Sequence, residues 1–282
     1  MKKILHLILS KGLGLYINIL SFVYPKKSLE LAYQYFTNPT DGRLNAENLP
    51  EILLEANREV ITIDDHYFQS YIWLGNENKI LLIHGWESNA SRWENFLPYL
   101  KKSGSTIIAI DAPAHGLSSG REFNVPTYAK YINAISEIHK PKYIVGHSLG
   151  GAACAFYQRH YQNHQIQKMV LLGTPSDAKI IFKNYINMLG LNLRVYEYLR
   201  NYSKKRFDNL DIEKYSIAKT LQNTTISGII AHDILDDVVS FEESKKIAQT
   251  WKTAQVIKTN GLGHSMHDDE LYKTIYTFLF EA

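Results

Sequence analysis

Residues 143–156 read YIVGHSLGGAACAF, and this stretch decides the fold. The apolar start predicts a short strand and the alanine-rich end predicts a helix, so Ser148 falls in a very tight turn between them. Gly146 and Gly150 leave room for that turn, because a side chain at either position would collide with the neighbouring helix or strand. A strand before the G-x-S-x-G pattern and a helix after it are the context in which a strained turn exposes the serine hydroxyl.

Outward from this stretch, apolar runs alternate with helix patterns from Lys79 onward. This alternation is typical of an α/β fold with a mostly parallel sheet and helices on both faces. The expected strands are residues 79–83, 106–110, 142–145, 169–172, 225–231 and 255–258, and the expected helices are 90–102, 126–139, 241–251 and 268–280. Before them, residues 59–63 and 66–74 alternate as the strands of a hairpin turned at Asp64 and Asp65.

The alternation stops between Pro175 and Asn223, where helical patterns follow one another without a strand. We expect a small helical cap above the carboxyl edge of the sheet, where open α/β folds bind ligands. Its closely spaced apolar residues predict a cleft for an apolar acyl group. The expected division is an N-terminal helical extension at 1–55, a core at 56–175 and 224–282, and the cap insertion at 176–223.

The N-terminal residues 1–24 predict one or two amphipathic helices with a break at Gly12 and Gly14. Their start imitates a signal peptide, but Lys11 interrupts the apolar run and no small-x-small cleavage site follows before Pro25, so secretion is not expected. An apolar helix face in this segment is expected to be shielded from water. Burial on the rest of the protein, contact with a membrane surface and a homodimer are the open alternatives.

Composition bounds the function classes. The chain has 282 residues, 45% of them hydrophobic and 21% charged, which is ordinary for a globular α/β protein. The net charge of +3 is too small to favour a nucleic-acid partner. No apolar run approaches the ~18 residues of a membrane span. The single cysteine, Cys154, excludes an internal disulfide and is expected to be buried. We expect a cytoplasmic protein, with membrane association as an alternative.

Ser148 needs a base and an acid to act as a nucleophile, and both follow it in the chain. His264 comes after the last expected strand, and the preceding Gly263 frees the loop to turn back toward the serine. Asp236 and Asp237 come after the strand before it, where an acid partner belongs. Three matches, each at the end of an expected strand and in the order Ser, Asp, His, predict a catalytic triad.

These residues and their motifs resemble the α/β-hydrolase superfamily. The matching pieces are HGW at 84–86, DAPAHGLS at 111–118, GHSLGG at 146–151, DDVV at 236–239 and GH at 263–264. The resemblance covers residues from about Glu59 onward, and its D-x-V-V-P pattern assigns the acid to Asp236, although Ser240 replaces the proline. If the loop after the strand is shifted by one residue, Asp237 is the acid of the triad instead. Backbone amides of Trp86 and Leu149 are expected to form an oxyanion hole.

The resemblance implies a serine esterase that forms an acyl-enzyme, with a carboxylic ester as first substrate and a thioester as second. Acyltransferase, peptidase and C–C hydrolase activities use the same residues, and a non-catalytic ligand-binding member of the fold is a further alternative. No cofactor or metal is implied.

Other histidines have structural interpretations. His84 and His115 are expected to hold loops, and His267 lacks a preceding glycine. His160 and His164 have a possible metal spacing but no acidic third ligand nearby, so a solvated surface is expected.

Overall fold

The computed structural model describes residues 2–281 of the chain, and side chains from residue 8 to residue 281. The contacts divide the chain into two compact units. Residues 39–176 and 217 onward form an α/β unit, whereas the residues up to 38 and residues 177–216 form a helical unit.

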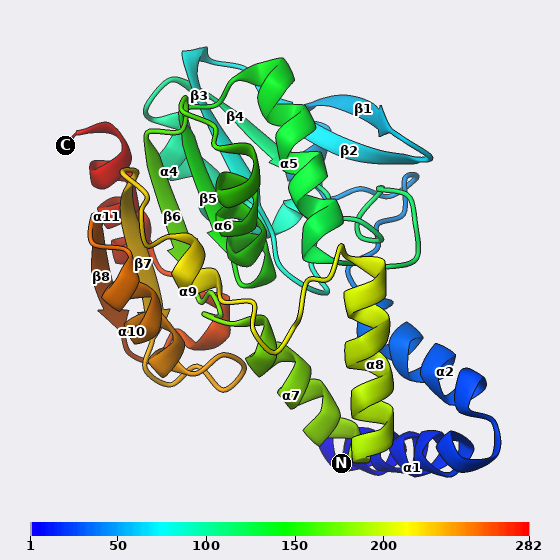
Figure 1. The fold of residues 1–282 in the computed structure, drawn as a ribbon. Coiled ribbons are helices and arrows are strands. Elements are labelled where there is room, and N and C mark those ends of the chain that lie inside the picture. The colour runs from blue at the N-terminus through cyan, green and yellow to red at the C-terminus, as the bar shows by residue number, and fades with distance from the viewer. Residues whose placement is uncertain (1, 282) are drawn as a thin grey trace. The chain divides into compact units, whose positions relative to one another are not determined.

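The α/β unit is built on an eight-stranded sheet (Figure 1). Its strands are β1 (Asn57–Ile63), β2 (His66–Trp73), β3 (Asn76–Ile83), β4 (Ser105–Ile110), β5 (Tyr143–His147), β6 (Lys168–Leu172), β7 (Ser227–Asp233) and β8 (Ala254–Thr259). The spatial order is β1-β2-β4-β3-β5-β6-β7-β8. The β1–β2 and β2–β4 pairs are antiparallel, and every other pair is parallel. The predicted α/β class and the predicted hairpin are therefore confirmed.

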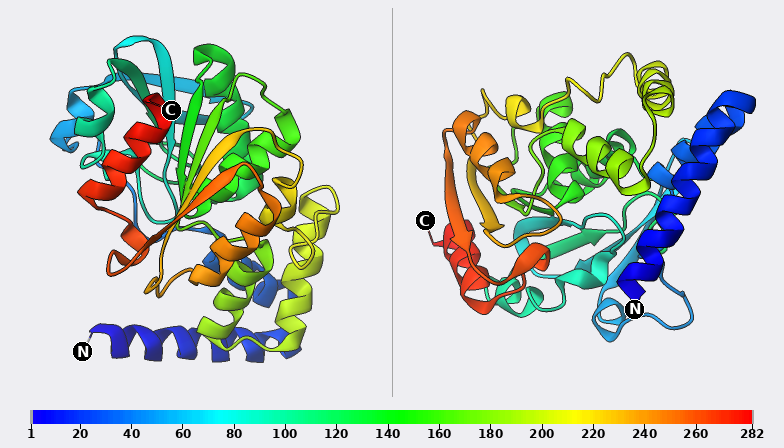
Figure 2. Two further views of the ribbon diagram at one scale, coloured as in Figure 1. Left: turned by 90° about the vertical axis from the view of Figure 1, so that its left-hand side faces the viewer. Right: turned by 90° about the horizontal axis from the view of Figure 1, so that it is seen from below.

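Helices cover both faces of this sheet (Figure 2). They are α3 (Glu51–Leu54), α4 (Leu97–Lys101), α5 (Val125–His139), α6 (Leu149–Tyr161), α9 (Ile217–Thr220), α10 (Phe241–Thr250) and α11 (Asp269–Phe280), with 3-10 turns η1 (Ala90–Trp93) and η2 (Gly263–Ser265). On one face, Ile80 and Leu82 of β3 share a buried cluster with residues of α4 and α11. The inner strands are apolar on both sides, as burial between two helix layers requires.

The helical unit consists of α1 (Lys2–Val23), α2 (Pro25–Thr37), α7 (Ala178–Leu189) and α8 (Leu193–Arg206). Its core combines side chains from all four helices: Ile17, Ala32, Tyr33, Phe182, Tyr185, Leu189, Leu191, Val195 and Leu199. Polar contacts join the same helices, because the Tyr185 hydroxyl donates to the Ala32 carbonyl over 2.6 Å and the Asn18 amide donates to the Gly190 carbonyl over 2.9 Å. Among the described helices, none combines the length and the apolar character that crossing a membrane requires.

Three expectations from the sequence differ from this arrangement. The N-terminal helices and the inserted helices, expected as separate parts, share one core, and residues 39–55 belong with the α/β unit. Of the apolar residues that predict a cleft, Phe182, Tyr185, Leu189 and Leu191 are buried in that core, whereas Ile180, Ile181 and Ile186 are partly buried and Met188 is exposed. The expected helix at 90–102 consists of η1 and α4 as two short turns.

The predicted glycine break in the first helix is also wrong, because α1 is continuous. Gly14 serves packing instead. A Cβ atom there would lie 1.8 Å from the Leu189 carbonyl oxygen, so only glycine lets the end of α7 approach this closely. Gly12, by contrast, has no atom within 4 Å of its would-be Cβ.

These two glycines supply a matched pair of variants. Gly14→Ala is expected to destabilise the protein by about 1–3 kcal/mol, because a buried overlap forces the backbones apart. Gly12→Ala is expected to stabilise it by about 1 kcal/mol, since alanine favours an exposed helix interior. Denaturant unfolding followed by circular dichroism measures both, and equal effects from the two variants would contradict the packing of α1 on α7.

Candidate active site

Ser148 lies between the end of β5 and the start of α6, in a backbone conformation with φ of 53° and ψ of −123°. A positive φ is strained for a residue with a side chain and costs about 1–3 kcal/mol. The neighbours make it possible. A Cβ on Gly146 would lie 2.6 Å from the Gly151 Cα of the helix, and one on Gly150 would lie 2.3 Å from the Ile83 carbonyl oxygen after β3. The predicted need for both glycines is thus confirmed.

His264 stands in η2, after β8, and its ring points at the serine. The Ser148 hydroxyl lies 2.9 Å from His264 Nε2. Gly263 has a φ of 59°, which suits glycine and turns the loop just before the histidine. The structure therefore brings together two predicted site residues that are 116 positions apart.

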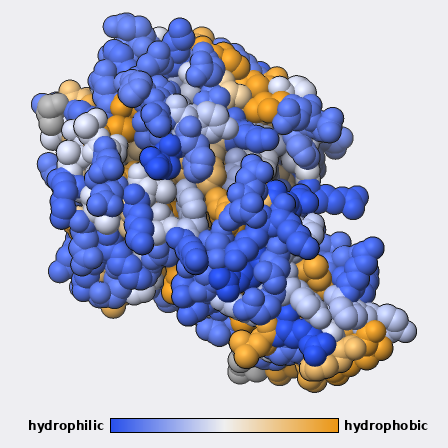
Figure 3. All heavy atoms as spheres, in the orientation of Figure 1, coloured by the Kyte–Doolittle hydropathy of each residue, from blue (hydrophilic) through white to orange (hydrophobic). Residues whose placement is uncertain are grey.

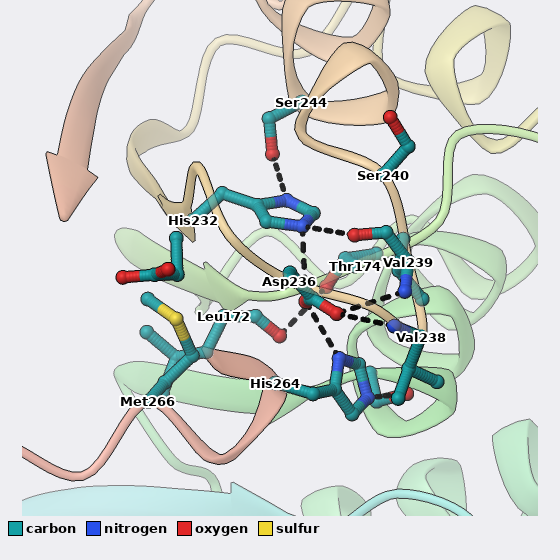
Figure 4. A network of polar contacts seen from close by, with 12 residues as sticks. Leu172, Thr174, His232, Asp236, Val238, Val239, Ser240, Ser244, His264 and Met266 are labelled. Carbon is teal, nitrogen blue, oxygen red and sulfur yellow. Dashed lines mark hydrogen bonds and ion pairs between the residues drawn. The ribbon is translucent and has the colours of Figure 1, made fainter. Parts of the chain in front are cut away.

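Asp236 completes the series, because its Oδ2 lies 2.7 Å from His264 Nδ1 (Figure 4). Its Oδ1 accepts the amides of Val238 and Val239, each over 2.9 Å. Burial raises the pKa of this carboxyl, but hydrogen bonds from His232, His264 and the two amides outweigh burial and hold the pKa well below its usual range. The neighbouring Asp237 is exposed, so the geometry selects Asp236 of the two candidates.

His232 contacts Asp236 from the side opposite His264, a feature that sequence reasoning missed. Its Nε2 lies 3.2 Å from Asp236 Oδ2 and 2.8 Å from the Val239 carbonyl oxygen, so this nitrogen donates. Its Nδ1 accepts from the Ser244 hydroxyl over 2.5 Å (Figure 4). The ring is fully buried. The carboxylate thus has a histidine donor on each side. The His264 ring continues to Ser148, whereas the His232 ring continues to the buried Ser244 of α10.

Asp233 holds the loop that carries His264, and sequence reasoning missed it as well. Its Oδ2 accepts the Leu262 amide over 2.9 Å and the Thr259 hydroxyl over 2.8 Å, and its Oδ1 accepts the Gly261 amide over 3.2 Å. Burial raises the pKa of this carboxyl, yet these hydrogen bonds together with the Leu235 amide keep it below its usual value. The signal in the sequence was an acidic residue ending a buried strand three positions before Asp236.

His147 supports the same histidine from the serine side. Its Nε2 donates to the His264 carbonyl over 2.7 Å, and the two rings lie 4.9 Å apart. Burial holds the pKa of His147 well below its usual value, so the ring is neutral at pH 7. His264 is thus oriented through its ring, its carbonyl and the loop before it.

The two residues expected to supply oxyanion donors lie on either side of the serine. Leu149 is the first residue of α6, and the first bond within this helix runs from the Ala152 amide to the Ser148 carbonyl. The Leu149 amide therefore has no acceptor in its own helix. Trp86 follows Gly85, whose would-be Cβ lies 2.9 Å from the Ser148 Cβ, so this loop passes directly beside the serine.

The predicted loop-holding roles of His84 and His115 are confirmed. His84 Nε2 accepts the Ala112 amide over 2.9 Å, and His115 Nε2 accepts the Glu87 amide over 2.9 Å. Burial lowers the pKa of His84 well below its usual value and that of His115 to about 4, so both rings remain neutral. They fix the loop that includes Gly85.

The remaining candidates lie outside the site. His267 Nδ1 contacts the Tyr272 hydroxyl over 2.5 Å and makes no contact with Ser148. His160 stacks on Phe156, with ring centroids 3.8 Å apart, and no metal-binding group of three or more His, Cys, Asp or Glu occurs in the part of the chain that the structure describes. Cys154 is buried, as expected.

Comparison with known proteins bears on the family and the fold of the chain. A family model described as "alpha/beta hydrolase fold" matches residues 78–223, just over half of the chain. A serine hydrolase-like protein of Danio rerio is 30% identical to this chain, over 45% of this chain and 41% of its own length. A serine hydrolase-like protein of Homo sapiens is 33% identical, over 34% of this chain and 49% of its own length. The chain therefore spans less than half the length of these curated relatives.

Among solved structures, Est1E of Butyrivibrio proteoclasticus with bound ferulic acid has a TM-score of 0.65 and 17% identity, covering 79% of this chain and 98% of Est1E. That likeness concerns the fold, since the identity is low. Together with the match of the family model, it confirms the fold predicted from the sequence. The chain belongs to the α/β-hydrolase family.

Proposed function

We propose that the protein is a serine hydrolase that cleaves a carboxylic ester, or in second place a thioester, through an acyl-enzyme. One observation carries the proposal: the unbroken series from Ser148 Oγ to His264 Nε2 and from His264 Nδ1 to Asp236 Oδ2, at 2.9 and 2.7 Å. Membership of the α/β-hydrolase family and the serine hydrolase-like relatives support it.

In the proposed reaction, Ser148 Oγ attacks the acyl carbonyl carbon while His264 Nε2 takes the hydroxyl proton. The resulting oxyanion receives hydrogen bonds from the backbone amides of Leu149 and Trp86. His264 then returns the proton to the departing alcohol or thiol, which leaves Ser148 acylated. A water molecule, deprotonated by His264, attacks the acyl carbon. The bond from this carbon to Ser148 Oγ then breaks, His264 returns the proton to Ser148 Oγ, and the carboxylic acid is released.

Asp236 stabilises the positive charge that the His264 ring acquires in each half-reaction. It is suited to this role because its carboxyl is ionised well below neutral pH. Asp233, His147 and His232 touch no reacting atom in this scheme, and act as positioning residues. Acyltransferase, peptidase and C–C hydrolase reactions would use the same groups with a different substrate.

Ser148→Ala is expected to lower turnover of p-nitrophenyl esters on the order of 10⁶-fold, because the attacking oxygen is removed. Folding should be largely unaffected, since the change removes one hydroxyl and its hydrogen bond to His264 and leaves the Cβ in place. Ser227→Ala, which removes an exposed hydroxyl at the start of β7, is the matched control and should retain full activity. Retention of more than about a tenth of the activity in Ser148→Ala would rule out the nucleophile assignment.

Asp236→Asn is expected to lower kcat by about 10⁴-fold, because an amide cannot stabilise the imidazolium and favours the wrong tautomer. Asp237→Asn changes an exposed neighbour in the same loop and is expected to retain wild-type kcat. Steady-state kinetics with the same ester compares them. A larger loss in Asp237→Asn would assign the acid to the other carboxylate.

Asp233→Asn is expected to lower kcat by about 10–100-fold with little change in KM, because the loop that carries His264 loses acceptors and a shift of about 1 Å is costly in a triad. The split between kcat and KM separates positioning from a general loss of folded enzyme, and the melting temperature is recorded alongside. An unchanged kcat would mean that the carboxylate does not position His264.

A further inference from the structure

Helix α1 is apolar on both of its faces, which is unusual for a helix at a protein surface. One face, with Leu13, Ile17 and Leu20, is directed into the helical unit and is buried or partly buried. The polar side chains in the middle of α1 serve the same unit, because Lys11 Nζ donates to the Asn187 carbonyl over 2.7 Å and Asn18 bonds to Gly190. The contacts of α1 with the rest of the helical unit are thus made by this one face.

The opposite face is exposed and carries large apolar side chains. Leu15 is 62% exposed, Ile19 55% and Phe22 67%. At 100° per residue the exposed apolar positions fall within one continuous arc of the helix. The arc consists of Ile8, Leu9, Leu15, Tyr16, Ile19, Phe22 and Val23, followed by the exposed Tyr24. In Figure 3 hydrophobic residues accordingly gather over α1, which Figure 1 labels in the same orientation.

The sequence around this arc is rich in cations and poor in carboxylates. The sequence from Met1 to Leu29 contains Lys2, Lys3, Lys11, Lys26 and Lys27 and no acidic residue, and the first carboxylate is that of Glu30. Arg194 at the start of α8 adds a cation, since its guanidinium lies 4.6 Å from the centre of the Phe22 ring. Glu30, which lies at the same end of α1, is paired with Lys27 over 3.6 Å. An apolar strip bordered mainly by cations fits a surface that is apolar inside and anionic at its boundary.

We propose that the exposed arc of α1 docks on a lipid surface containing anionic headgroups, with the helix lying in the plane of the surface. Its apolar side chains would enter the boundary between headgroups and acyl chains, and the exposed cations Lys26, Lys27 and Arg194 would remain among the headgroups. Figure 2 shows α1 as one straight element along its unit, as an in-plane helix requires.

The charge pattern favours this occupant over a second copy of the chain. A symmetric dimer places the same patch against itself, so the excess of cations would face cations, and Glu30 beside them is already paired with Lys27. A transmembrane position is not the proposal, since none of the described helices is long and apolar enough to span a bilayer.

The test is flotation of the full-length protein with vesicles, in the Ser148→Ala background so that no lipid is hydrolysed. We expect binding to vesicles of phosphatidylcholine with phosphatidylserine, weaker binding to phosphatidylcholine alone, and a decline of the difference as salt is raised. Replacing Leu15, Ile19 and Phe22 together by serine is expected to lower binding by about tenfold or more, because most of the inserted apolar area is lost.

Leu54, Val60 and Leu74 give a matched control, since these apolar side chains are equally exposed but lie on the α/β unit. Their joint replacement by serine should leave vesicle binding unchanged, and the melting temperature shows whether either variant remains folded. Light scattering with size-exclusion chromatography measures the mass. A wild-type dimer that does not bind vesicles and becomes monomeric in the α1 variant would overturn the proposal, as would a monomer that binds neither vesicle.

Discussion

The structure depends on one strained turn, the positive φ of Ser148 between β5 and α6. This conformation is stable only because the surroundings hold it. Strand β5 is paired on both sides, the Ser148 amide donates to the Leu172 carbonyl over 2.8 Å, and Gly146 and Gly150 let helix and strand close around the turn. The serine is therefore positioned by the sheet and not by a mobile loop, which gives its partners a fixed target.

Those partners come from the carboxyl ends of β7 and β8. Parallel strands end at the same edge of a sheet, so residues far apart in sequence meet there. Two acids at the end of β7 have separate tasks. Asp236 contacts the His264 ring, and Asp233 accepts hydrogen bonds from amides in the loop after β8 that leads to His264. His147 holds the His264 carbonyl from the serine side. Precise placement of one imidazole is thus shared among several buried groups.

The sequence was informative where the chain is locally regular. The strands and the triad order could be predicted because apolar runs and loop residues follow the sheet one after another. Asp233 and His232 could not, since their roles depend on which amides and carboxylates lie opposite them in three dimensions. The shared core of α1, α2, α7 and α8 could not be foreseen either. It joins segments about 150 residues apart, as the Tyr185–Ala32 hydrogen bond with a separation of 153 positions illustrates.

The central claim is that Ser148 is a nucleophile activated by His264. The most direct measurement is the mass of the intact protein after reaction with an alkyl fluorophosphonate, followed by peptide mapping. The account predicts a single adduct on Ser148 in the wild-type protein, and a strongly slowed reaction in His264→Ala. An unmodified protein, or an adduct on another residue formed equally fast without His264, would contradict it.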